Sequence, residues 1–201
     1  IGVFSIRKNE VQRVVSVKEK NDKYPVKQLV RSGMKNIYTT HPVGFSQIMR
    51  DNNVYFLKRT VDPPIRTFSL IEYPDKHLLI STSNGLMEYV EGKGSADIKT
   101  DIDFSSMRIF DMKTDDDLLI LATNGNGIYI LKDKKLYQHL SVTNGLSDNN
   151  CKKMCTSGDT IYVSTDNGLN ILVKQNHLWN ISEIITVKNG LLSNTVNDAA
   201  I

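Results

Sequence analysis

Glycine recurs along this chain at a nearly constant interval, and no other feature of the sequence constrains the fold more. The spacings between successive copies are 42, 41, 42 and 41 residues. The recurring positions are Gly2, Gly44, Gly85, Gly127 and Gly168. Two apolar residues, a small residue and a threonine precede the last four of them, and those threonines are Thr40, Thr82, Thr123 and Thr165. A period near forty residues predicts an array in which each repeat is one supersecondary unit.

Each repeat has the pattern of four short strands. In the clearest copy we expect strands at residues 151–156, 161–165, 169–173 and 178–182. Ser157-Gly158-Asp159 and Asp166-Asn167-Gly168 lie between the first three, and Asn and Gly tolerate the positive φ of hairpin turns. Four strands per repeat are typical of a β-propeller blade. Helical repeats need long stretches with apolar residues three and four apart, and the sequence has none.

The predicted fold is therefore all-β: a β-propeller fragment with four whole four-stranded blades and part-blades at both ends. We treat residues 1–201 as a single propeller region. The whole blades are expected near residues 24–60, 64–103, 105–147 and 149–187, with part-blades at 1–20 and 191–201. Residues 195–201 are expected to be the innermost strand of a further blade, and no helix longer than two turns is expected. The unpaired edges predict contact with remaining blades of a longer protein, or a homodimer.

The amino-acid composition argues against several classes of fold and function. The 25 basic and 22 acidic residues are interspersed and give a net charge of only +3, which argues against a nucleic-acid partner or contact with an anionic membrane. The longest apolar run, residues 118–122, is too short to cross a bilayer. Four alanines against 18 asparagines and 12 glycines argue against a helical bundle. Two cysteines cannot form a disulfide framework.

A second motif joins the blades, and it carries a family resemblance. Residues 143–150 read TNGLSDNN and residues 188–196 read KNGLLSNTV. Together with the repeated small-Thr-x-Asn-Gly-Leu pattern, this resembles the two-component regulator propeller repeat family. The family favours tryptophan three residues before the repeated threonine, whereas this chain has Ile37, Leu79, Ile120 and Tyr162 there.

The resemblance implies a function. In that family such repeats form the periplasmic, extracytoplasmic sensor of hybrid histidine kinases from Bacteroidetes, and glycans are the usual signal. By this resemblance the chain is expected to sense an oligosaccharide, with the remaining blades and domains of the same receptor as partners. The alternatives are a protein-interaction scaffold and, less favoured, a propeller lyase or hydrolase. No catalytic motif is present, so we expect no enzyme activity from this segment and no cofactor.

Strand direction predicts where a ligand would bind. In a four-stranded blade, the turn between the second and third strands lies at the same end as the loop leading to the next blade. That end, which also contains Asn84 and Ser105, surrounds the mouth of the central channel and presents amides and hydroxyls suited to sugar hydroxyls. The predicted ligand-binding residues are Asn149, Asn150, Asn194, Asn124 and Asp166. The alternative is that each side chain only completes its own turn.

Other candidate sites are weaker. Asp111 and residues 115–117 lack the spacing of a calcium-binding loop, so we expect an acidic turn at the first hairpin of the blade. Cys151 and Cys155 would lie on the same side of one strand, roughly 13 Å apart at ~3.3 Å per residue, which excludes a disulfide. They are expected to be buried free thiols. The histidines occupy different blade positions, so no metal site is predicted.

Overall fold

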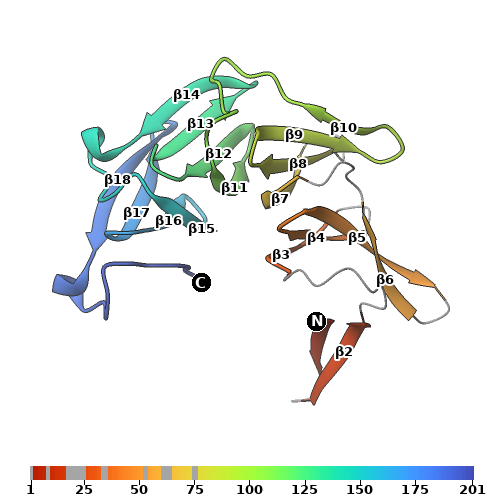
Figure 1. Ribbon diagram of the computed structural model, residues 1–201. Coiled ribbons are helices and arrows are strands. Elements are labelled where there is room, and N and C mark those ends of the chain that lie inside the picture. The colour runs from red at the N-terminus through yellow and green to blue at the C-terminus, as the bar shows by residue number, and fades with distance from the viewer. Residues whose placement is uncertain are drawn as a thin grey trace. The chain divides into compact units, whose positions relative to one another are not determined.

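The computed structural model describes residues 2–7, 10–16, 26–32, 36–51, 54–59, 65–73 and 77–201, and these residues form β-strands joined by turns and loops. Their strands form four four-stranded antiparallel sheets and one two-stranded sheet (Figure 1). In each four-stranded sheet, strands consecutive in sequence are neighbours. The all-β prediction with four whole blades is confirmed.

We number the blades along the chain. The two-stranded sheet is β1 (Gly2–Arg7) and β2 (Glu10–Ser16). Blade 1 is β3 (Gln28–Arg31), β4 (Ile37–His41), β5 (Gly44–Asp51) and β6 (Val54–Arg59). Blade 2 is β7 (Thr67–Tyr73), β8 (His77–Thr82), β9 (Gly85–Val90) and β10 (Gly94–Asp97). Blade 3 is β11 (Ile109–Asp115), β12 (Leu118–Thr123), β13 (Ile128–Lys132) and β14 (Lys135–Leu140). Blade 4 is β15 (Cys151–Ser157), β16 (Thr160–Thr165), β17 (Gly168–Gln175) and β18 (Leu178–Ile185).

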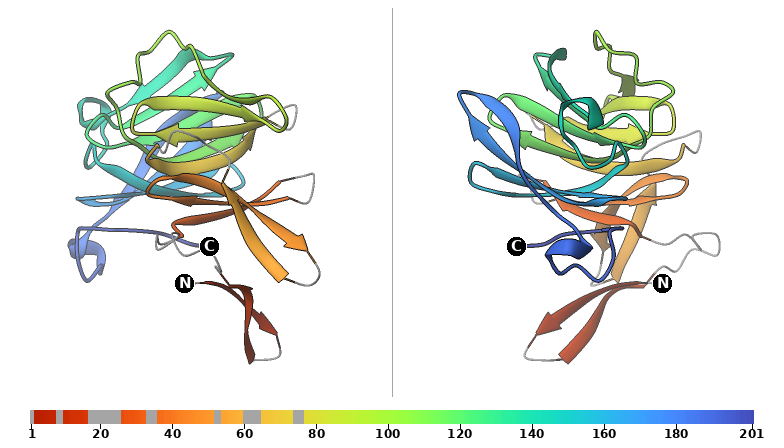
Figure 2. Two further views of the ribbon diagram at one scale, coloured as in Figure 1. Left: turned by 45° about the vertical axis from the view of Figure 1, so that its right-hand side comes forward. Right: turned by 90° about the vertical axis from the view of Figure 1, so that its left-hand side faces the viewer.

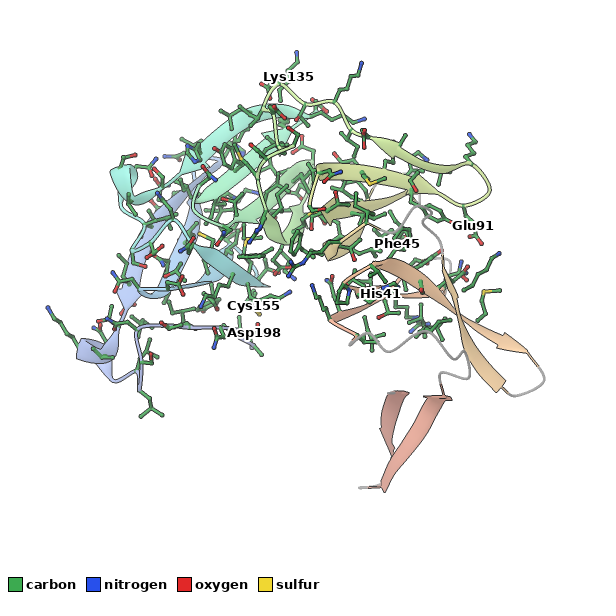
Figure 3. All side chains as sticks on the ribbon, in the orientation of Figure 1. His41, Phe45, Glu91, Lys135, Cys155 and Asp198 are labelled. Atoms are coloured by element: carbon green, nitrogen blue, oxygen red, sulfur yellow. The ribbon has the colours of Figure 1, made fainter. Side chains whose placement is uncertain are left out.

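The chain divides into two compact units, and each has its own core. The first unit comprises Ile1–Thr82 and Met87–Ala96, and the second comprises Ser83–Leu86 and Asp97–Ile201. The core of the first unit consists of buried apolar side chains from β4, β5, β7 and β8, including Tyr38, Phe45 and Leu70. Figure 3 labels Phe45 on β5 beside His41 on β4.

In the second unit, blades 3 and 4 lie side by side and bury a continuous apolar layer between them (Figure 2). The single tryptophan, Trp179 on β18, is 1% exposed within this layer. Polar side chains also join the two blades. The side-chain amide of Gln138 on β14 accepts a hydrogen bond from the backbone N–H of Trp179 at 2.9 Å and donates one to the backbone carbonyl of Trp179 at 2.7 Å. The amide group of Gln138 thus pairs with β18 as a neighbouring peptide group would.

A bulge recurs in the first strand of three blades and changes which side chains are buried. The strand register shifts between Thr67 and Ser69, between Ile109 and Asp111, and between Cys151 and Lys153. A bulge inserts one unpaired residue, so the alternation of faces changes there.

The bulge in β15 corrects the prediction that Cys151 and Cys155 are both buried. The extra residue in this strand puts Met154, rather than Cys155, on the same side as Cys151. Cys151 and Met154 are buried, and Cys155 is only half-buried. Both cysteines are free thiols, and burial raises the pKa of Cys151 to about 12.

Residues outside the sheets form turns and loops. The described helical elements are two single 3₁₀ turns, η2 (Val142–Asn144) and η3 (Val187–Asn189). Both end at a glycine with positive φ, 109° at Gly145 and 105° at Gly190. Residues 195–201, predicted as an innermost strand, belong to no strand, although the Val196 N–H donates to the carbonyl of Thr165 at the end of β16, at 2.9 Å.

Candidate functional site

In the second unit, the loop that follows each blade packs against the turn between that blade's second and third strands. After blade 3, the Asn149 carbonyl accepts hydrogen bonds from the Gly125 and Gly127 N–H groups at 3.1 and 2.9 Å. After blade 4, the Asn194 carbonyl accepts from the Gly168 N–H at 2.7 Å. These loops and turns therefore share one end of each blade, which we call the loop face.

The periodic glycines make this close packing feasible. A Cβ atom on Gly127 would lie 2.1 Å from the carbonyl oxygen of Leu140, and one on Gly168 would lie 2.7 Å from that of Ile185. Gly85 would place a Cβ 3.2 Å from the backbone of Phe104. The three φ angles lie between 76° and 121°, a region that other residues rarely adopt. Any side chain here would separate the turn from the loop that it supports.

Asn149 and Asn194 hold their own loops together. The Asn149 Oδ1 accepts a hydrogen bond from the Val142 N–H, and the Asn194 Oδ1 accepts one from the Val187 N–H, each at 2.9 Å. Each bond satisfies the first N–H of a 3₁₀ turn, which has no partner within the turn. The Asn194 Nδ2 also donates to Asn167 Oδ1 at 3.3 Å. Their carbonyls and side-chain oxygens thus have structural partners, and their contact with a ligand stays a prediction.

Asn150 and Asp166 meet, as expected from their shared end of blade 4. The Asn150 Nδ2 donates to Asp166 Oδ2 at 3.0 Å, and the Lys152 Nζ lies 2.6 Å from Asp166 Oδ1. Hydrogen bonding from Lys152 is the main reason that the pKa of Asp166 is lowered, and Asn150 adds a smaller effect in the same direction. Lys152 also donates to Asn197 Oδ1 at 3.0 Å. We call Asn150, Lys152 and Asp166 the Asp166 network.

The sequence pattern did not predict Lys152 as a residue of the candidate site. It is the unpaired residue of the bulge in β15, between the paired residues Cys151 and Lys153. Bulges redirect a side chain, and here the redirected amine reaches the loop face. A strict alternation of faces along the strand does not indicate this position.

Asn124 joins this group through the backbone. It forms an isolated antiparallel bridge with Asn150, and its N–H donates to the Arg108 carbonyl at 2.9 Å. The structure thus connects Asn124, Asn150 and Asp166 in one series of contacts. Asn149 adjoins that series, and Asn194 occupies the equivalent loop after blade 4.

A hollow of about 440 Å³ lies elsewhere on the loop face of the second unit. It is lined by residues 84–86, at the turn before β9 and the start of that strand, and by residues 97–105, from the end of β10 into the loop leading to β11. We call it the 97–105 hollow. Asn84 and Ser105 were expected at this end of the blades, but the hollow itself was not predicted.

The 97–105 hollow combines apolar and acidic groups. Leu86 and Phe104 are 5% and 4% exposed, and Phe104 packs edge-on against Tyr129 with ring centres 5.3 Å apart. The Leu136 N–H donates to both carboxylate oxygens of Asp101, at 2.9 and 3.0 Å.

Asp103 is ordered in a similar way. The Ser105 N–H donates to its Oδ1 at 2.9 Å. Hydrogen bonds from the Ser105 side chain and backbone hold the pKa of Asp103 below its ordinary value. This carboxylate is therefore charged and oriented at neutral pH.

In the described part of the chain, no group of three or more histidine, cysteine, aspartate or glutamate residues could hold a metal ion. Nor does any helix among the described residues have the length and apolar character needed to cross a membrane.

Comparison with solved structures identifies the fold as that of propeller-blade proteins. The extracellular domain of a proposed one-component system, BT4673 from B. thetaiotaomicron, aligns with a TM-score of 0.69 and 21% identity over 91% of this chain. The extracellular domain of a proposed hybrid two-component system, BT3049 from the same organism, aligns with a TM-score of 0.67 and 14% identity over 87% of the chain. The chain spans 24% of the length of each of these two domains.

Propeller enzymes share the same fold. Virginiamycin B lyase from Staphylococcus aureus aligns with a TM-score of 0.60 and 10% identity, over 85% of this chain and 66% of the lyase. No protein-family model and no curated protein sequence matches the chain. At these identities the resemblance defines a class of fold, the β-propeller, which extracellular sensor domains and a lyase both use.

Proposed function

We propose that this chain is part of the periplasmic, ligand-sensing propeller of a hybrid two-component sensor histidine kinase, and that its ligand is an oligosaccharide. The observation that carries the proposal is the alignment of 87% of the chain with the extracellular domain of the proposed hybrid two-component system BT3049. The Asn-Gly-Leu loops after blades 3 and 4 add support, because they resemble the propeller repeats of such receptors and are built alike in the structure.

The chemistry of the loop face suits a neutral, hydroxyl-rich ligand. Lys152 balances the charge of Asp166, so the Asp166 network attracts neither an anion nor a metal ion strongly. Amides and hydroxyls both donate and accept hydrogen bonds, as sugar hydroxyls do. We propose that the ligand contacts this face at some of the predicted residues, Asn149, Asn150, Asn194, Asn124 and Asp166. The remaining blades and domains of the receptor, and a second copy of it, are the proposed protein partners.

Calorimetric titration tests the proposal. The extracytoplasmic domain containing this chain would be titrated with neutral tetrasaccharides of glucose, mannose and xylose. We expect one of them to bind with a dissociation constant that the full receptor reproduces as half-maximal kinase activation. If no saccharide binds, and none changes the phosphorylation of the receptor, the proposed function is wrong.

A lyase is the second candidate, because the alignment with virginiamycin B lyase covers 85% of the chain. Mass spectrometry of the titrated saccharides separates the two functions. A sensor returns its ligand unchanged, whereas a lyase or hydrolase yields cleaved products. Accumulation of such products would favour the enzyme.

A further inference from the structure

The 97–105 hollow has the size and position of a binding site. Its volume of about 440 Å³ lies in the range of roughly 300–1,000 Å³ usual for small-molecule pockets. It is formed by a turn between second and third strands and by a loop leading to the next blade. These are the two kinds of segment that form the loop face elsewhere in the unit.

The charges around the 97–105 hollow select among ligands. Three carboxylates line it, from Asp97, Asp101 and Asp103, against one cation, Lys99. In the part of the chain that the structure describes, no lysine or arginine forms an ion pair with Asp101 or Asp103, whereas Lys152 pairs with Asp166 at 2.6 Å. The excess negative charge disfavours phosphate, sulfate and uronic acids. Hydroxyl groups, in contrast, donate to carboxylates in strong, charge-assisted hydrogen bonds.

Other lining residues supply the hydrogen-bonding and apolar groups that a sugar ring contacts. Thr100 and Ser105 supply hydroxyls, and Asn84 supplies an amide. Ile98 and Ile102, both half-buried, supply apolar surface, which suits the C–H groups of a pyranose. Pockets for small molecules commonly combine such apolar surface with a few polar groups that fix the orientation of the ligand.

The lining is also held in place before any ligand arrives. The Leu136 N–H fixes the carboxylate of Asp101, and Ser105 fixes that of Asp103. Gly85 also allows the turn to pack closely against the backbone of Phe104 in the loop. A site ordered in advance loses less conformational entropy on binding.

We infer that the 97–105 hollow is a subsite that binds one or two rings of a neutral oligosaccharide, with carboxylates accepting from ring hydroxyls. The inference rests on the proposed function and adds a location that is separate from the Asp166 network. It also adds a selectivity, since acidic saccharides should be rejected.

The test uses calorimetric titration of the extracytoplasmic domain containing this chain with neutral tetrasaccharides and with a chondroitin sulfate tetrasaccharide. Asp103→Asn keeps the size of the side chain but removes its charge, and Thr100→Trp fills the hollow. Asp159→Asn, in the turn between β15 and β16, is the matched control. Thermal unfolding verifies that each variant folds, and Asp103→Asn remains informative if Thr100→Trp does not.

We expect Asp103→Asn to weaken binding of a neutral tetrasaccharide about tenfold or more and Thr100→Trp to abolish it, with Asp159→Asn unchanged and the sulfated saccharide not bound. If the wild type binds a neutral saccharide and both hollow variants bind it within about twofold, the subsite is wrong while the proposed function stands. The subsite is also wrong if the sulfated saccharide competes for it. If the wild type binds no saccharide, the subsite is wrong, and the proposed function is wrong as well when no saccharide changes the phosphorylation of the receptor.

Discussion

Replacing Gly127 with alanine should destabilise the second unit more than the same change at a glycine with open surroundings. The φ of +76° at Gly127 lies in the left-handed region, where a side chain costs about 1–2 kcal/mol. The new Cβ would also lie 2.1 Å from the Leu140 carbonyl oxygen, so the loop must move. Overpacking of this kind costs about 1–3 kcal/mol. We expect Gly127→Ala to lower the free energy of unfolding by about 2–5 kcal/mol.

Urea unfolding followed by tryptophan fluorescence measures this loss. Trp179 is the single tryptophan, and its burial in the core of the second unit makes it a reporter for that unit. Gly158→Ala and Gly190→Ala, both in the second unit, are the controls, since φ is +53° and +105° there and nothing lies within 4 Å of the added Cβ. They should lose only about 1–2 kcal/mol. If Gly127→Ala costs no more than Gly158→Ala, close packing is not what requires the periodic glycine.

Three further predictions concern single side chains. The pKa of Asp166 is lowered from 3.8 mainly by Lys152, so the pair stabilises the fold above that pH, and this contribution is lost as pH falls through the folded pKa. Lys152→Met should raise the Asp166 pKa in a carboxyl NMR titration, and an unchanged pKa would contradict the assignment. At pH 8 a disulfide reagent should modify half-buried Cys155 before Cys151, because burial raises the pKa of Cys151 to about 12. If a fast phase of modification remains in Cys155→Ser, this order of reactivity is wrong. Asp111, expected in an acidic turn, lies instead within β11 and is 1% exposed, because its carboxylate accepts a hydrogen bond from the Met154 N–H at 2.9 Å. Asp111→Ala removes this buried acceptor and should cost about 1–3 kcal/mol in urea unfolding, where a loss below ~0.5 kcal/mol would argue against this role.

Part of the candidate site could be predicted from strand direction alone. Asn150 and Asp166 are 16 positions apart in the sequence, yet both fall at one end of blade 4, and the structure joins them at 3.0 Å. Lys152 could not be placed in this way, because the bulge in β15 changes the alternation of faces. The same bulge explains why Met154 is buried while Cys155 is not.

The 97–105 hollow leaves no motif in the sequence. Asn84 and Ser105 come from segments separated by β9 and β10, and the volume between them depends on how the loop leading to β11 packs on the turn before β9. Asp101 is similar, because its partner, the Leu136 N–H, is a backbone group that every residue but proline has. Such contacts follow from three-dimensional packing, and residue identity alone does not predict them.

The sequence by itself determined the fold class, the number of whole blades and the end of each blade where polar loops gather. It did so because turn geometry repeats with the period of the chain: a glycine such as Gly127 is required wherever a turn meets a loop at backbone contact. Only the tertiary structure decided which polar groups satisfy one another and which line a hollow. Asn149 holds its own loop, the carboxylate of Asp166 pairs with Lys152, and Asp101 and Asp103 line a space without an ion-pair partner among the described residues. Those outcomes depend on distances of a few ångströms between segments far apart in the chain, and a repeat pattern carries no information at that scale.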